Sequence, residues 1–523
     1  MKIVKLTLVS SIVSLNLMAV DLATVMSNVA QTNPKVIQKK KEYNRFYEEL
    51  MISKGDYFLP RVDLEASIDR NKYKNKKPSA YEYKNTGKNL TLTATENLFN
   101  GFGTVSNIDA KKAALASSAF SYLQTVNEEA LKVSKIYLDL IRNKELLSVE
   151  IDNYNKHRKI FSAVQARSNA GVGVVGDLQE ITAKTNLAYA NYLTQSKNLK
   201  ASQIAMNKVL GNTIDINRLI TPQVGTNINY SLSQAIDFAL THNPTIFIQK
   251  YNVIRARYEQ KKGEKEFLPQ VDFVVKKEYN DGKERVFNQD LENEKLSVGL
   301  KLKWNIFNGF KDVHSKNRDI SLVHIEQEKY NSIKRDLIEE IELALTTYRM
   351  QEKEYKYLTN YVTNAEAKLY TNTKLFQIGK KSLFEFLASQ TDFNSAKEKL
   401  INTKYDLIFA KLRVLKALGI LADMANPNIK KEVGITGDGV HDYLAMNYKA
   451  DTLPVREDIV NRTGSVSLED EAVSFDTYKV VGSKVEKQAR YISEEPYSVK
   501  IGNSEYFDEE YIAPRKAVTS YKK

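Results

Sequence analysis

Four stretches of the chain alternate hydrophobic and polar residues with a period of two. They cover residues 62–69 and 90–95 in the first half, and 271–275 and 296–306 in the second half. Successive side chains of a β-strand point to opposite faces, so each stretch predicts a strand with one apolar and one polar face. The longest has about ten residues, which suits a transmembrane β-strand. A soluble sheet edge is the alternative.

Long stretches without proline follow the strands. No proline occurs between residues 78 and 222 or between 269 and 427. The pattern over 103–169 and 311–378 predicts two helices, each roughly 100 Å long at 1.5 Å per residue.

Shorter helical patterns stand on both sides of these long helices. Amphipathic patterns before the strands, and patterns after the turns at 170–176 and 379–382, predict helices over 21–53, 231–263, 177–210 and 383–418. A short turn keeps two helices adjacent, so each long helix and its return predict an antiparallel hairpin. Apolar residues every seventh position favour coiled-coil packing over a simple buried stripe: Val133, Leu140, Leu147, Tyr154 and Phe161, then Ile341, Tyr348, Tyr355, Val362, Leu369 and Phe376.

The two halves of the chain repeat each other. Asn-Leu-Phe-Asn-Gly-Phe at 97–102 recurs as Asn-Ile-Phe-Asn-Gly-Phe at 305–310, 208 positions later. Gly171 and Gly211 have counterparts at the same offset, and Phe-Leu-Pro at 58–60 recurs at 267–269. Insertions concentrate in loops, so a constant offset predicts two copies packed side by side in one assembly.

Each repeated motif ends a predicted strand and opens a long helix. Asn-Gly permits a positive φ, so we predict a strand-to-helix junction at each copy. The junction residues are Asn100, Gly101, Phe102, Asn308, Gly309 and Phe310. Nearby aromatic residues, Phe99, Trp304 and Phe307 among them, are typical of a membrane interface.

Composition excludes several classes of site. The chain has no cysteine, which rules out disulfides and thiolate metal sites, and its five histidines are not spaced as metal ligands. The net charge of +13 comes from lysines spread along helical faces, with no recognisable nucleic-acid module. No nucleophile elbow or carboxylate pair in a pocket is recognisable. We therefore expect no cofactor, no metal, no nucleic-acid partner and no enzymatic activity.

The pattern divides the chain into four parts. Residues 1–20 predict a signal peptide, 21–230 and 231–421 the two repeats, and 422–523 a polar, partly disordered extension. No other stretch is apolar enough for a transmembrane helix. Four amphipathic strands cannot close a barrel alone, so a membrane sheet predicts an oligomer of two, three or four copies.

The duplicated Asn-Pro, Leu-Pro and Asn-Gly-Phe motifs, with Leu-Gly endings at 210–211 and 418–419, resemble the TolC-type outer-membrane channels of efflux and type I secretion systems. The resemblance covers about 21–421. It implies an α+β membrane protein: a homotrimer with a 12-stranded β-barrel in outer-membrane lipid, continued by a periplasmic α-helical tunnel. It also implies a periplasmic adaptor and an inner-membrane ABC or proton-driven transporter as partners.

The same resemblance implies a periplasmic gate at the hairpin ends. Asp177, Phe376, Lys381 and Glu385 match its positions, with Phe376 in place of a tyrosine, while Ala388 replaces a second carboxylate. Asp177 would pair with Lys381, and threefold symmetry would make a ring of Glu385. Ordinary helix-end charges, with Asp177 as an N-cap, are the alternative.

These expectations predict a channel that passively conducts exported substrates and performs no covalent chemistry. A structural coiled-coil envelope protein without a channel is the alternative. Protein secretion and multidrug efflux are both consistent with the sequence.

Overall fold

The computed structural model describes residues 20–75, 81–211, 213, 215–222, 228–284, 289–436 and 439–440. The chain divides into two units, Met1–Met446 and Asn447–Lys523, and every described residue belongs to the first. The predicted signal peptide, apart from Val20, and most of the predicted extension lie outside the described residues.

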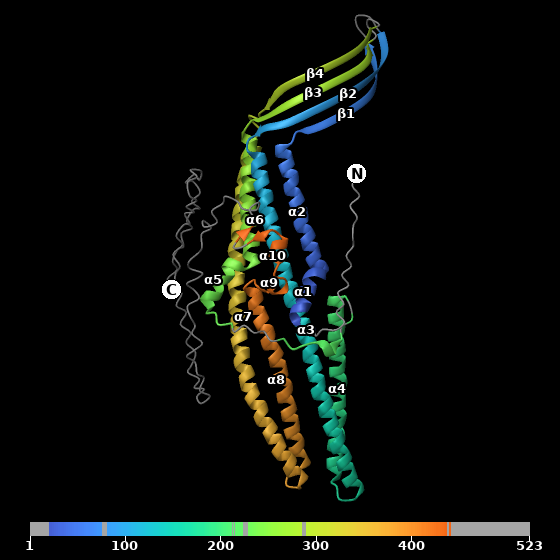
Figure 1. The fold of residues 1–523 in the computed structure, drawn as a ribbon, viewed down its shortest axis with the longest axis vertical. Helices are drawn as coiled ribbons and strands as arrows, with labels where there is room; N and C mark the ends of the chain where they lie inside the picture. The colour runs from blue at the N-terminus through green and yellow to red at the C-terminus, as the bar shows by residue number, and fades with distance from the viewer. Residues whose placement is uncertain are drawn as a thin grey trace, which may run out of the picture. The chain divides into compact units, whose positions relative to one another are not determined.

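Four antiparallel strands form one sheet in the order β1-β2-β3-β4 (Figure 1). Their bounds are Arg61–Asn75, Tyr81–Asn100, Gln270–Glu284 and Gln289–Lys303. The four strands are confirmed, but the prediction that Trp304 and Ile306 continue the last strand is wrong. Glu96, the equivalent of Trp304, pairs with Phe273 of β3, and β2 continues past a bulge at Leu98, whereas among the described strands β4 has no second neighbour that could extend it.

Two long helical hairpins follow the strands (Figure 1). Helices α3 and α7 contain 67 residues each and run antiparallel to α4 and α8. The bounds are Gly103–Asn169 for α3, Val175–Leu210 for α4, Lys311–Gln377 for α7 and Leu383–Ala417 for α8. These hairpins are confirmed, with α3 and α7 at the predicted 208-residue offset.

The helix before each sheet hairpin is broken, contrary to the single helix predicted in each repeat. The observed helices are α1 (Leu22–Thr32), α2 (Pro34–Phe58), α5 (Leu232–His242) and α6 (Pro244–Gly263). Asn33 and Asn243 lie before prolines, which disfavour helical backbone at the preceding residue. Both asparagines are extended, and each side chain caps the next helix.

The chain after α8 folds back onto the helices. It forms α9 (Leu421–Ala425), α10 (Ile429–Glu432), β5 (Ile435–Thr436) and β6 (Gly439–Val440). Ile429, Val433 and Ile435 are buried in the main core, and Glu432 pairs with Lys40 of α2. The start of the predicted extension is therefore part of the packed structure.

The apolar interior has two sections. A large cluster surrounds α3 where α1, α2, α8 and α9 pack on it. A smaller cluster fills the hairpin ends, with Val164 and Ile181 from one hairpin and Leu383, Phe386 and Leu387 from the other. Short 3₁₀ helices, η1 (Ile216–Arg218) and η2 (Glu264–Phe267), connect the main elements. No helix in the described ranges is both long and apolar enough to cross a membrane.

Candidate functional site

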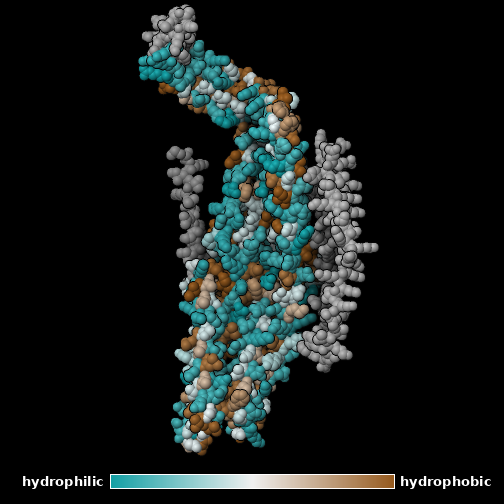
Figure 2. Space-filling model, turned by 180° about the vertical axis from the view of Figure 1, so that it is seen from behind, coloured by the Kyte–Doolittle hydropathy of each residue, from teal (hydrophilic) through white to brown (hydrophobic). Residues whose placement is uncertain are grey.

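One face of the sheet is apolar and open to solvent. The register places alternate residues of all four strands on it, and their side chains are exposed. They are Val62, Leu64, Ile68, Leu90, Leu92, Phe273, Leu296, Val298, Leu300 and Leu302. Figure 2 shows hydrophobic residues gathered over the part of the sheet nearest the helices. An apolar face of this extent indicates a membrane or protein partner.

The opposite face of the sheet is polar. Thr91 and Thr93 of β2 lie beside Glu278 and Lys276 of β3 in register. On this face β1 carries three carboxylates (Asp63, Glu65, Asp69) and Arg61, which pairs with Asp63, whereas β4 carries three lysines (Lys295, Lys301, Lys303). Among the described strands, β1 and β4 each have a neighbour on one side only. Apolar and polar faces alternate in this way in membrane β-barrel strands.

The first predicted junction is a tight, covered turn. Gly101 and Phe102 both have a φ of 61°, and Phe102 directly precedes α3. The Asn100 side chain accepts a hydrogen bond from the Thr104 amide at 3.1 Å. A Cβ added at Gly101 would lie 2.8 Å from the Leu268 Cβ, so the segment before β3 covers this turn.

The second junction has the same backbone but no cover. Gly309 and Phe310 have φ values of 58° and 61°, and Asn308 donates a hydrogen bond to Asp312 at 3.3 Å. A Cβ added at Gly309 meets no atom within 4 Å. The two motif copies thus fold alike locally but differ in their surroundings.

The predicted interface aromatics gather beside these junctions. Phe99 packs edge-on against Phe102, with ring centroids 5.3 Å apart, and Phe307 packs in the same way against Phe310 at 5.5 Å. Trp304 donates from its indole nitrogen to the carbonyl oxygen of Phe267 at 3.2 Å. Their position at a membrane boundary stays a prediction.

At the hairpin ends, Lys381 pairs within its own helical segment. Its Nζ lies 2.6 Å from Glu385 Oε1, one turn away. Ser382 and Glu385 form a capping box that begins α8. Hydrogen bonds from Lys381, then from Ser382, lower the pKa of Glu385 below its usual value and keep the carboxylate charged.

The other two predicted gate residues lie apart from this pair. Asp177 is in the first turn of α4, which begins at Val175, so Asp177 is not the N-cap. Within the described part of the chain Asp177 forms no ion pair, and the predicted pairing with Lys381 is not present in one copy. Phe376 stacks on Phe386, with centroids 5.0 Å apart, and packs against the cluster at the hairpin ends.

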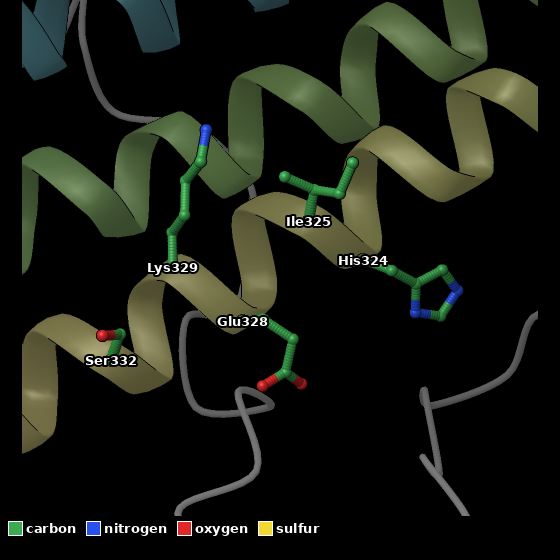
Figure 3. A pocket seen from close by; sticks show the side chains of 5 residues that line it. All are labelled: His324, Ile325, Glu328, Lys329 and Ser332. Atoms are coloured by element: carbon green, nitrogen blue, oxygen red, sulfur yellow. The ribbon is translucent and has the colours of Figure 1, made fainter.

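A shallow depression lies on α7, lined by His324, Ile325, Glu328, Lys329 and Ser332 (Figure 3). These residues all come from one helix. Glu328 and His324 point to one side, and Lys329 points to the other. Across the described ranges, no group of three or more histidine, aspartate or glutamate side chains could hold a metal ion.

Sequence reasoning missed the polar seam along which α3 of one hairpin packs on α8 of the other. Arg142 binds Asp406 at 3.0 Å, and Glu145 binds Lys404 at 3.1 Å. Each of these contacts joins residues more than 250 positions apart, so no local pattern in the sequence could reveal them.

A chain of hydrogen bonds ends on a pair of carboxyl groups in this seam. The amide of Gln390 donates to Asn394, Asn394 donates to Asn153, and Asn153 donates to Glu150. Glu150, which is buried, hydrogen-bonds Glu398. Burial, and then the charge of Glu150, raise the pKa of Glu398 to about 7.

Comparison with known proteins identifies the family of this architecture. The family model described as "Outer membrane efflux protein" matches residues 25–212 and 235–420, both repeats. The chain belongs to the outer membrane efflux protein family. The matched ranges include both sheet hairpins, both junctions and both helical hairpins.

Curated relatives are distant. The outer membrane efflux protein BepC of Brucella suis is 20% identical over 376 residues, which is 71% of this chain and 79% of BepC. The alkaline protease secretion protein AprF of Pseudomonas aeruginosa is 22% identical over 302 residues, 56% of this chain and 62% of AprF. TolC of Escherichia coli is 18% identical over 415 residues, 77% of this chain and 83% of TolC.

Solved structures share the fold. The Campylobacter jejuni CmeC outer membrane channel aligns with a TM-score of 0.67 at 16% identity, covering 79% of this chain and 89% of CmeC. VceC of Vibrio cholerae aligns with a TM-score of 0.65 at 15% identity, covering 76% and 96%. The resemblance to TolC-type channels is thus confirmed, and the protein is an outer-membrane protein with a long periplasmic helical domain.

Proposed function

We propose that the protein is a homotrimeric channel-tunnel that passively conducts exported substrates across the outer membrane. Three sheets would close one 12-stranded barrel, and three pairs of hairpins would form the tunnel below it. The observation that carries this proposal is the sheet, which has one exposed apolar face and one polar face. Among the described strands its two edges are unpaired, and on the polar face carboxylates predominate on β1 and lysines on β4.

The sheet also disfavours the alternative of a structural coiled-coil envelope protein. An open edge presents unpaired amide and carbonyl groups, which are costly in lipid and promote aggregation in water. Pairing β4 of one copy with β1 of the next would remove all edges and bring lysines beside carboxylates.

The transport partners follow from the family rather than from this chain. A periplasmic adaptor would join the helices to an inner-membrane transporter, either an ABC exporter or a proton-driven pump, which supplies the energy. BepC is named for efflux and AprF for protease secretion, so the cargo would be set by the transporter.

The gate would lie at the hairpin ends, where Lys381 and Glu385 form a charged pair in each copy. Phe376 would support it from the apolar cluster behind, and Asp177 would contribute through the neighbouring copy.

Recording from planar lipid bilayers that contain the purified protein tests the channel. We expect discrete single-channel currents from the intact assembly. The proposal would be contradicted if the protein inserts as an oligomer but carries no current at any voltage, both as wild type and as a Lys381 variant.

A further inference from the structure

One contact between the two repeats is made only once in the chain, although both sequence motifs that form it occur twice. The Asn97 amide donates to the Asp272 carboxylate at 2.6 Å, where the end of β2 pairs with the start of β3. Beside it, Leu268 and Lys265 cover Gly101. Except for Lys265, these residues belong to the motifs that the sequence repeats, Asn-x-Phe-Asn-Gly-Phe and Phe-Leu-Pro-x-Val-Asp.

The other copies of both motifs have no corresponding contact. Asn305 is the counterpart of Asn97, and Asp63 is the counterpart of Asp272. They lie at opposite edges of the sheet, beyond the end of β4 and in β1. Gly309 is uncovered, and Leu59, the counterpart of Leu268, is 67% exposed against 40% for Leu268.

We propose that the two unused motif copies meet between neighbouring molecules, so that Asn305 of one copy donates to Asp63 of the next. Applying the 208- and 209-residue offsets to the β2–β3 register gives the register of this contact. Thr95 opposite Val274 becomes Lys303 opposite Glu65, and Phe99 opposite Val271 becomes Phe307 opposite Val62. The inference rests on the proposed homotrimer, and it adds the residues through which the copies join.

Three features of the described residues fit this register. It places the Lys303 ammonium beside the Glu65 carboxylate, which cross-strand pairing favours. It lets β4 extend beyond Lys303, as β2 extends to Asn100. It also brings Leu59 of the next copy toward Gly309, as Leu268 lies against Gly101 within one chain.

Disulfide trapping tests the register, because the chain has no cysteine of its own. Lys303→Cys is combined in turn with Asp63→Cys, Glu65→Cys or Ser67→Cys, and membranes are oxidised and run on non-reducing gels. We expect linked trimers, strongest for the Glu65→Cys pair. The matched control, Thr95→Cys with Val274→Cys, occupies the equivalent position inside one chain and should give no linkage between chains.

The outcomes separate this inference from the proposed function. Strongest linkage through position 63 or 67 would overturn the register. Absence of linkage in all three pairs, while glutaraldehyde still yields trimers, would overturn the contact and leave the trimer intact. Absence of trimers with either reagent would overturn both.

Discussion

Equivalent helices of the two repeats have opposite surroundings. Leu412 of α8 is 1% exposed, but its counterpart Ile204 of α4 is 59% exposed; Val149 of α3 is 5% exposed, but its counterpart Tyr357 of α7 is 73% exposed. Helices α3 and α8 pack against each other in the polar seam. Their counterparts α7 and α4 do not pack against each other within one chain. Within one chain the duplicated unit thus makes its helix contact between repeats on one side only.

These exposed positions indicate where a second copy packs. Large apolar residues on α4 and α7 occupy positions whose counterparts are buried, so we infer that α7 of one copy packs on α4 of the next. The seam within the chain is rich in ion pairs and amides, while the inferred seam between copies is apolar and aromatic.

Ile204→Glu should abolish the trimer while leaving the single chain folded. An exposed substitution changes the stability of one chain by less than about 0.5 kcal/mol, but an unpaired carboxylate buried between copies costs about 3 kcal/mol or more. Size-exclusion chromatography and circular dichroism measure assembly and folding. The control is Leu187→Glu, because Leu187 is 56% exposed and its counterpart Ser395 is exposed as well. Equal behaviour of the two variants would contradict the inference.

Gly101→Ala should destabilise the folded chain more than Gly309→Ala does. Both positions have positive φ, which costs roughly 1 kcal/mol for alanine, but the new Cβ at position 101 also meets Leu268 and Lys265. Urea unfolding of detergent-dispersed single chains should show the difference, which we expect to be about 2 kcal/mol. In the assembled protein the two variants should be similarly impaired. Equal unfolding of the single chains would contradict this account of the junctions.

The polar seam should make stability depend on pH. Folding raises the pKa of Glu398 from 4.5 to about 7, so the folded chain holds a proton that the unfolded chain has released. Its contribution to stability is present below pH 4.5 and is lost as the pH rises through about 7. Since Glu398 is partly exposed, we expect a loss of about 1 kcal/mol between pH 5 and 8.

Thermal unfolding of wild type and Glu398→Gln at both pH values measures this loss. Glutamine cannot titrate, so the variant should lack this part of the pH dependence. Glu354→Gln, which removes the partner of the neighbouring Lys399, is the matched control and should retain it. The same pH dependence in all three proteins would exclude the Glu150–Glu398 pair as its source.

Lys381→Glu should raise single-channel conductance, because it removes the ion pair at the end of the second hairpin and places like charges near Glu385. We expect the conductance to increase roughly two-fold or more, because that pair narrows the tunnel. The folding stability should change by less than about 1 kcal/mol, because the ion pair is exposed. Lys380→Glu, which changes the same charge one residue away, is the control. Unchanged conductance in Lys381→Glu would remove Lys381 from the gate.

The sequence predicted the elements better than their contacts. Strand alternation and helix periodicity are local, so β1 to β4 and both hairpins were recognisable, as was the repeat that supplies the inter-copy register. The breaks at Asn33 and Asn243 were missed although both precede proline. The capping box of Ser382 and Glu385 was also readable, because the two residues have the Ser-x-x-Glu spacing.

Contacts across hairpins could not be derived in that way. The contact between Glu150 and Glu398 depends on the axial position of α3 relative to α8, which is set by the packing of side chains between the two helices. The core positions of Ile429 and Val433 depend likewise on where the chain returns after α8. Truncation after residue 425 would therefore remove core residues.

Native mass spectrometry of the detergent-extracted protein measures how many copies assemble. We predict three copies for the wild type and single chains for Ile204→Glu. A wild-type protein that remains a single chain, or that assembles with a different number of copies, would contradict it.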